Sequence, residues 1–159
     1  MKMPESPVFT MSQVLPHTGH MLLIDELVQH DETGVVTALT IRPETLFCDG
    51  VTGVPAWVGL EYMAQTACAY SGVDEARAGQ RASISLLLGS RSFKAHIPIF
   101  PIGSRLLVEA RLLMRDENDL VAFRCSIKDA VTNAELAAGD IKAIRPANLN
   151  ALIKEQLNG

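Results

Sequence analysis

The pattern of apolar and polar residues divides the chain into strand-like segments and one long helical segment. Residues 21–29 and 35–41 are rich in apolar side chains, and the turn sequence Asp-Glu-Thr-Gly at positions 31–34 separates them, which predicts a β-hairpin. Four later segments also have the composition of strands, and two short segments near the ends are expected to be helical, the first with Ser12 as its cap. The later strands are expected at residues 82–93, 104–114, 120–128 and 135–144, and the short helices at residues 11–17 and 148–157.

Residues 55–71 form the clearest predicted helix. Pro55 suits a first helical turn, and Gly72 suits the position after a helix C-terminus. Glu61 is the one charged residue between positions 57 and 70, and a helix that is apolar nearly all round should be buried on most faces. The element order predicts an α+β fold, in which an antiparallel sheet of about five or six strands wraps a long central helix. The free edges of such a sheet favour a dimer in which two sheets pair.

Length and composition are those of an ordinary globular protein, so residues 1–159 are expected to form one domain. Hydrophobic residues make up 48% of the chain and charged residues 20%, without an apolar run long enough to cross a membrane. The first ten residues lack the pattern of a signal peptide, which favours cytoplasmic residence. The net charge of −4 argues against a nucleic-acid binder. Cys48, Cys68 and Cys125 lack zinc-site spacing, so they are expected to be reduced and mostly buried, with no metal bound.

Glu61 is the most informative candidate for chemistry. Burial of a carboxyl group favours its protonated form, which a general acid needs near neutral pH. Trp57 lies one turn before Glu61, and Gln65 and Cys68 lie on the same face in the following turns. The pattern alone leaves two interpretations open: a catalytic carboxylate, or a structural one in a buried salt bridge or at a local opening to solvent.

Other polar residues are less specific. His17 and His20 precede the first predicted strand, where a histidine is usually structural or solvated. Arg91 and Lys94, like Arg81 and Arg105, lie near predicted strand ends; they form either a solvated surface or a dock for a phosphate group. The sequence contains neither a serine in a nucleophile elbow nor a glycine-rich phosphate loop, which argues against a triad hydrolase and a phosphotransferase.

Three passages resemble the 3-hydroxyacyl-acyl-carrier-protein dehydratases. Leu-Pro-His at 15–17, followed by Met-Leu-Leu-Ile-Asp at 21–25, is similar to the opening motif of that family, and Glu-Tyr-Met-Ala-Gln at 61–65 resembles its helix motif. Ser-Phe-Lys at 92–94 and Pro-Ile-Gly-Ser-Arg-Leu at 101–106 are similar to a third motif with extra residues between its halves. The likeness spans roughly residues 13–145, the expected core of the domain, and leaves a short C-terminal tail. The passage at 54–65 resembles a dehydratase-like subgroup associated with aryl polyene gene clusters.

The resemblance implies a hotdog fold with active sites at a dimer interface. It also implies dehydration of a 3-hydroxyacyl thioester on acyl carrier protein to the trans-2-enoyl thioester, in fatty-acid-like or aryl polyene biosynthesis, with no cofactor besides the carrier's phosphopantetheine. By position Glu61 takes the role of the family's glutamate, and Gln65 would orient it. The N–H groups of Ala56 and Trp57 would polarise the thioester carbonyl. Arg91 and Lys94 would contact the phosphopantetheine.

One departure concerns the second catalytic group. The family's Gly-His-Phe-Pro sequence before the helix reads Gly-Val-Thr-Gly at 50–53, and the side chain of Val51 cannot transfer a proton. Three alternatives remain open. His17, or His20, takes the place of the missing histidine; a second hotdog subunit in a heterodimer supplies it; or the protein no longer dehydrates. In the last case the chain would be an acyl thioesterase or a non-catalytic partner subunit of a heteromeric dehydratase.

Overall fold

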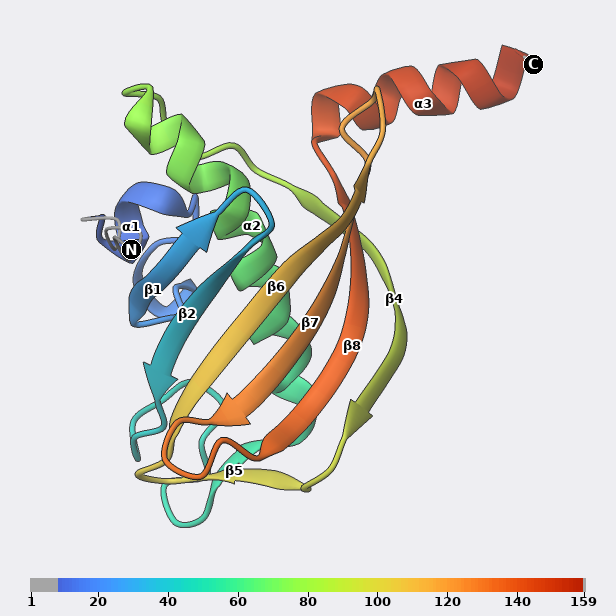
Figure 1. The fold of residues 1–159 in the computed structure, drawn as a ribbon. Coiled ribbons are helices and arrows are strands. Elements are labelled where there is room, and N and C mark those ends of the chain that lie inside the picture. Colours follow the sequence, from blue (N-terminus) through green and yellow to red (C-terminus); the bar gives the residue numbers. More distant parts are fainter. Residues whose placement is uncertain (1–8, 159) are drawn as a thin grey trace, which may run out of the picture.

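The protein is a six-stranded antiparallel sheet wrapped around one long helix. The computed structural model describes residues 9–158, except for the side chains of residues 146–149, 151 and 152. The strand order in the sheet is β1-β2-β6-β7-β8-β4, and helix α2 (Gly59–Arg77) lies against one face of it (Figure 1). The strands are β1 (Glu26–Asp31), β2 (Gly34–Thr40), β4 (Leu86–Ala95), β6 (Arg105–Arg115), β7 (Val121–Asp129) and β8 (Glu135–Ile144). This architecture confirms the predicted α+β class and is that of the hotdog fold.

The predicted hairpin is present but begins later than expected. Residues 19–21 form a short 3-10 turn, η1 (Gly19–Met21), and β1 begins only at Glu26. The backbone of Met21 and Leu23 is instead hydrogen-bonded to the side chain of Gln65 on α2. Backbone groups that a side chain already holds are not available to a strand partner, so the first part of the predicted strand is a loop.

Helix α2 is longer than predicted because Gly72 does not end it. A 3-10 turn, η2 (Ala56–Val58), leads into α2, which continues to Arg77. A Cβ atom at Gly72 would lie 1.8 Å from the carbonyl oxygen of Val14, so the glycine allows the short helix α1 (Met11–Val14) to pack against α2. The helix ends before Gly79, which adopts the left-handed conformation typical of a residue after a helix C-terminus (φ +73°).

Two other features of the structure differ from the predictions. Helix α1 begins after Thr10, whose N–H donates a hydrogen bond to the Gln13 side chain at 2.9 Å, so Ser12 is not the cap. A second, two-stranded sheet that was not predicted is also present, in which β3 (Gly53–Pro55) pairs with β5 (Ile99–Pro101); Pro55, expected to begin the helix, is the last residue of β3. This small sheet comes directly before η2 and fixes the point at which the helical segment begins.

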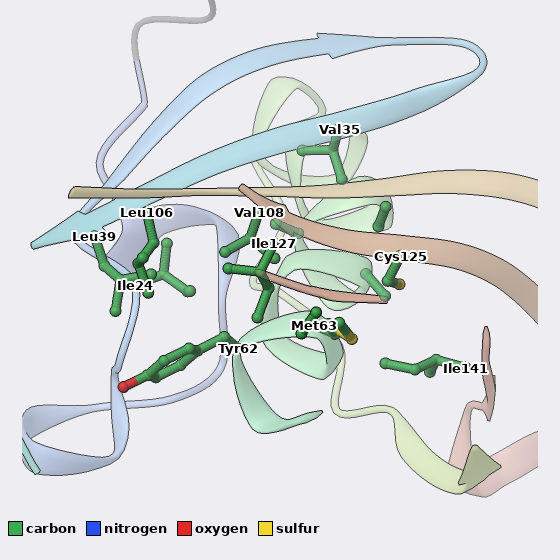
Figure 2. Close-up of a cluster of buried hydrophobic side chains, with 14 of the residues drawn as sticks. Ile24, Val35, Leu39, Tyr62, Met63, Leu106, Val108, Cys125, Ile127 and Ile141 are labelled. Carbon is green, nitrogen blue, oxygen red and sulfur yellow. The ribbon is translucent and has the colours of Figure 1, made fainter. Parts of the chain in front are cut away.

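The core lies between α2 and the concave face of the sheet. Tyr62 and Met63 on α2 are fully buried; Met63 points toward Val108 and Ile127 of the central strands, and Tyr62 points the other way, toward the side of Ile24 and Leu39 (Figure 2). The expected burial of the helix on most faces is therefore confirmed. Helix α3 (Pro146–Asn158) extends away from the end of β8 (Figure 1). Among the described residues, none of the helices is long and apolar enough to span a membrane.

Strand β4 is an exposed edge of the sheet. Its successive residues Leu86, Leu87 and Leu88 are 38%, 43% and 45% exposed. Because side chains alternate between the two faces of a strand, this edge is apolar on both faces. An edge strand of this kind is a surface that another strand can cover.

Candidate active site

Glu61 is half-buried in the first turn of α2, and its carboxylate is held by Gln65 one turn later. The Gln65 Nε2 group donates one hydrogen bond to Glu61 Oε1 at 3.1 Å and another to the Met21 carbonyl oxygen at 2.7 Å. Gln65 Oε1 accepts a bond from the Leu23 N–H at 3.0 Å. Gln65 is only 1% exposed, and these bonds use both its amide hydrogens and its oxygen. The Glu61 carboxylate is thus fixed by a buried amide through Oε1, and its Oε2 atom has no hydrogen-bond partner among residues 9–158.

A cavity of about 110 Å³ adjoins the Glu61 carboxylate, between α2 and the sheet. The helix contributes small or polar side chains to it at the spacing of one helical face. The cavity is lined on the helix side by Glu61, Ala64, Gln65, Ala67, Cys68 and Ser71. Ala64 and Ala67 leave space that larger side chains would fill, so the shape of the cavity follows directly from the residue types on this face.

The floor of the cavity is made by two rows of side chains across the sheet. Leu87 of β4, Ala143 of β8 and Val121 of β7 are register partners and form one row. Phe123 and Ile141 form the second row one repeat further along the strands. Residues two apart on a strand point to the same face, which explains why both rows face the helix. The floor is therefore apolar, in contrast to the helix side.

His17 lines the same cavity as Glu61. It lies in the segment between α1 and η1, which packs beside the first turns of α2 because Gln65 holds Met21 and Leu23. The His17 Nδ1 atom is buried and has no hydrogen-bond partner among residues 9–158. A buried ring nitrogen without a partner is costly, so His17 differs from a structural histidine whose ring nitrogens are satisfied.

Cys68 also faces the cavity. Burial raises the pKa of its thiol to about 11, despite a hydrogen bond with the Ser85 side chain that acts in the opposite direction. At neutral pH the side chain is therefore a neutral thiol and a weak nucleophile. Cys68 contributes shape and weak hydrogen bonding to the cavity, and Glu61 is the better candidate for chemistry.

The two backbone N–H groups expected to contact the thioester, at the start of the helix, differ in whether another group of the chain accepts their hydrogen bond. The Ala56 N–H donates to the Pro98 carbonyl oxygen at 2.9 Å, because β3 and β5 pair directly beside it, so it cannot polarise a thioester as expected. Trp57 is the second residue of the helical segment, and carbonyl groups of the same helix cannot accept its N–H. The Trp57 side chain does not line the cavity; it is 63% exposed and packs on Phe47, with ring centroids 5.6 Å apart.

Three further candidates lie away from Glu61. His20 is exposed and lines a separate hollow with Asp25 and Arg42. Arg91 and Lys94 are exposed on the edge strand β4, and neither lines the Glu61 cavity. The structure thus brings together Glu61, Gln65 and His17, and does not place His20, Arg91 or Lys94 with them.

The loop expected to contain the missing histidine is well ordered by its own hydrogen bonds. Asp49 Oδ1 accepts bonds from the N–H groups of Val51, Thr52 and Gly53 at 2.8, 2.7 and 3.1 Å. Val51 at the tip of this loop is 83% exposed and does not line the Glu61 cavity. The loop therefore contributes no proton-transfer group to the Glu61 cavity of its own chain.

Several lining residues were not predicted from the sequence. Ser71 and Ser85 face the cavity, as do the floor residues Val121 and Ala143. Ser71 could have been found by extending the Glu61 face three residues beyond Cys68, because it is the last residue of the predicted helix. The floor residues depend on strand register, which the sequence does not reveal. Among residues 9–158, no cluster of three or more metal-ligating side chains is present.

The fold and this site together define a hotdog-fold protein with a carboxylate on its central helix. Comparison with known proteins gives the class more narrowly. The family model described as ApeP dehydratase (ApeP-like) matches residues 9–154. No curated protein matches the sequence.

Solved structures agree with this assignment. A chain of the dehydratase heterocomplex ApeI:P from Xenorhabdus doucetiae is 26% identical, with a TM-score of 0.78 over 91% of this chain and 97% of that chain. Cj0977, a sigma28-regulated virulence protein from Campylobacter jejuni, is 15% identical with a TM-score of 0.57, over 82% of this chain and 80% of that one. A hypothetical thioesterase with coenzyme A from Streptococcus pneumoniae is 8% identical with a TM-score of 0.54, over 76% and 84%. The last two show the fold alone.

The chain belongs to the ApeP-like dehydratase family. It is therefore a hotdog-fold dehydratase of aryl polyene biosynthesis, which confirms the expected lyase class and the resemblance to the aryl-polyene-associated subgroup.

Proposed function

We propose that this chain converts 3-hydroxyacyl thioesters on acyl carrier protein to trans-2-enoyl thioesters, with Glu61 and His17 as the proton-transfer groups. The observation that carries the proposal is the cavity that both residues line, in which Gln65 fixes the Glu61 carboxylate and His17 Nδ1 is unpaired. The proposal requires no metal or other cofactor, because the carrier's phosphopantetheine brings the substrate and elimination of water is neither an oxidation nor a reduction.

The chemistry needs one base and one acid. One of the two groups removes a proton from Cα, and the electron pair of that C–H bond forms the new double bond to Cβ. The Cβ–O bond breaks, and the other group gives its proton to the departing hydroxyl, so that water leaves and the thioester stays intact. General acid–base catalysis of this kind contributes about 10²- to 10⁴-fold to a rate.

The thioester carbonyl is placed at the start of the helix in this proposal. The Trp57 N–H lies one turn before Glu61, and its position at a helix N-terminus favours the negative charge that develops on the carbonyl oxygen. With the carbonyl at Trp57, Cα and Cβ reach Glu61, and the remainder of the acyl chain continues along α2. Ala56 is excluded from this role by its bond to Pro98.

The active assembly is proposed to be a heterodimer with a second hotdog subunit. The solved relative is described as a heterocomplex, and β4 presents an edge that is apolar on both faces. In such a pair, a histidine from the second subunit is the alternative to His17. Acyl carrier protein is the proposed third partner, because the substrate class requires it; Arg91 and Lys94 remain its proposed contacts on exposed surface beside the sheet edge.

The test compares Glu61→Gln with a matched control, Glu117→Gln, an exposed residue in the β6–β7 turn. Glutamine keeps the shape of the side chain and removes the titrating group. We expect enoyl formation by Glu61→Gln to fall by about 10²- to 10⁴-fold, while the control retains full activity. Wild-type activity in Glu61→Gln would refute the assignment, and release of free thiol from saturated acyl thioesters would show a thioesterase instead.

A second test separates the two sources of the histidine. His17→Ala is assayed alone and after addition of the second hotdog subunit. Loss of activity in both conditions supports His17. If the His17→Ala variant is fully active with the second subunit, and the wild type alone is inactive, the catalytic histidine belongs to the second subunit. Glu61 would then be the catalytic group that this chain contributes.

A further inference from the structure

Residues 80–85, the strap, join α2 to β4 and belong to neither a helix nor a strand (Figure 1). The middle of the strap lies against α2, where the Cys68 thiol donates to the Ser83 carbonyl oxygen at 3.9 Å. The next odd-numbered residue, Ser85, is also hydrogen-bonded to the Cys68 side chain. Because no neighbouring strand holds residues 80–85, the position of the strap depends on its contacts with side chains of the helix.

The strap is a wall between the Glu61 cavity and a larger groove of about 590 Å³ on its other side. Ser85 lines the cavity, whereas the preceding residue, Ile84, lines the groove. Side chains of an extended segment alternate in direction, so one segment can face both spaces. The segment after α1 divides the same two spaces, since His17 lines the cavity and Pro16 and Thr18 line the groove.

The Glu75 carboxylate holds the strap against α2. Its Oε2 atom accepts a bond from the Ser83 N–H at 3.0 Å and another from the Ser83 hydroxyl at 2.5 Å. Hydrogen bonds to a carboxylate are stronger than those between neutral groups. Glu75 is half-buried near the end of α2 and does not line the cavity, so it acts on the cavity only through Ser83.

We propose that Glu75 is a positioning residue for the dehydration: by binding Ser83 it keeps the strap closed over the Glu61 cavity and separates that cavity from the groove. The inference rests on the proposed function, in which the acyl chain lies in this cavity along α2. With the strap held, Ser85 and its neighbours enclose the chain. Release of Ser83 would join the cavity to the groove, admit water beside the chain and weaken its apolar contacts.

The first measurement does not depend on turnover. Cys68 lies behind the strap, so the rate at which iodoacetamide alkylates it reports opening of the strap in the full-length protein; peptide mass spectrometry identifies the labelled residue. We expect Glu75→Ala to raise this rate by about 10-fold, because both bonds to Ser83 are lost. Ser83→Ala keeps the N–H bond and should raise the rate by about 3-fold.

Two controls separate the bonds from other effects. The charge of Glu75 helps to raise the pKa of Cys68, so its removal alone makes the thiol more reactive. Glu75→Gln removes this charge, but its amide oxygen still accepts both bonds, and we expect little of the rise seen in Glu75→Ala. Asp74→Ala, an exposed position in the same turn, should label at the wild-type rate.

The second measurement is steady-state kinetics with 3-hydroxyacyl thioesters, in the assembly in which the wild type is active. Loss of the wall in Glu75→Ala should raise KM by about 3- to 10-fold and leave kcat within about 2-fold, since the wall contacts the chain and not the reacting atoms. Glu75→Gln should restore the wild-type KM. General destabilisation would lower the active fraction, and with it kcat, without this change in KM.

Three results would overturn the inference: equal labelling of Cys68 in the wild type and Glu75→Ala, an equal rise in Glu75→Gln, or a lower kcat with unchanged KM in Glu75→Ala. The second of these would assign the effect to charge. Absence of enoyl formation by the wild type would refute the proposed function instead, and the labelling rates would still decide whether Glu75 holds the strap.

Discussion

The Gln65 amide and the Asp49 carboxylate each hold several groups of the chain, but in different surroundings. Gln65 is buried and connects two backbone groups of the η1 segment to Glu61. Asp49 is exposed and binds three successive N–H groups of its own loop. Both arrangements order a segment near the start of α2. Only that of Gln65 brings a proton-transfer group to a cavity, whereas that of Asp49 presents Val51 to solvent.

The difference shows that local order alone does not make a site. Asp49 accepts its bonds from N–H groups within four residues of its own position, so they are local contacts of one turn. Gln65 joins residues more than 40 positions apart in the sequence, and its bonds exist only when the loop before β1 packs on α2. Its contribution therefore couples the position of Glu61 to the tertiary structure.

Of the substitutions that test this comparison, Gln65→Leu is expected to have the largest effect, because it keeps the side-chain volume and removes every hydrogen bond of the amide. The Leu23 N–H and the Met21 carbonyl lose their partners, so unfolding in urea should show a loss of about 1–3 kcal/mol with an unchanged m-value. Because Glu61 is no longer held, kcat should fall by about 10- to 100-fold while KM changes little. Gln29→Leu, at an exposed position on β1, is the matched control. A variant with wild-type kcat would show that Gln65 is structural only.

A smaller effect is expected for Asp49→Asn, and it should depend on pH. The Thr52 hydroxyl and three backbone N–H groups donate to the carboxylate and hold its pKa well below the usual value. Because the pKa is lower in the folded state than in the unfolded chain, the stabilisation is fully present above the unfolded value near 3.9 and is lost as the pH falls below it. The difference in unfolding free energy between wild type and Asp49→Asn should therefore be largest near neutral pH and shrink toward pH 3. A difference that grows toward acid would contradict this account.

The sequence predicts the site to the extent that the site lies on one element. The face that contains Glu61, Gln65 and Cys68 follows from helical spacing, and all three line one cavity. The bonds from Gln65 to Met21 and Leu23 could not be predicted, because helical periodicity does not indicate which backbone groups, distant in the sequence, will pack against a side chain. For the same reason the resemblance assigns the Ala56 N–H to the thioester, whereas in the structure this N–H donates to the Pro98 carbonyl oxygen. The adjacent β3–β5 pairing that brings Pro98 there cannot be predicted from the sequence.

The fold shows the same limit. Strand-like segments and the central helix were predicted from composition and periodicity, and the sheet confirms them. Local rules assign Gly72 to a helix end, but in the structure it lies inside α2, where the absence of a Cβ atom allows the Val14 backbone to pack closely. Local rules identify glycine as unusual but do not distinguish a turn from a close contact between two helices.

The smallest effect on stability is expected for Val51→His, which restores the family's residue type to the loop. Val51 is 83% exposed, so the free energy of unfolding should change by no more than about 0.5 kcal/mol. Since residue 51 does not line the Glu61 cavity of its own chain, the substitution should not restore activity to a His17→Ala protein assayed alone. The double variant His17→Ala/Val51→His is measured beside His17→Ala for enoyl formation. Recovery of activity in the isolated double variant would mean that the loop of one copy reaches the cavity of another. The loop held by Asp49 would then lie close enough to a cavity for catalysis, and it would lack activity in the wild type only because residue 51 is valine.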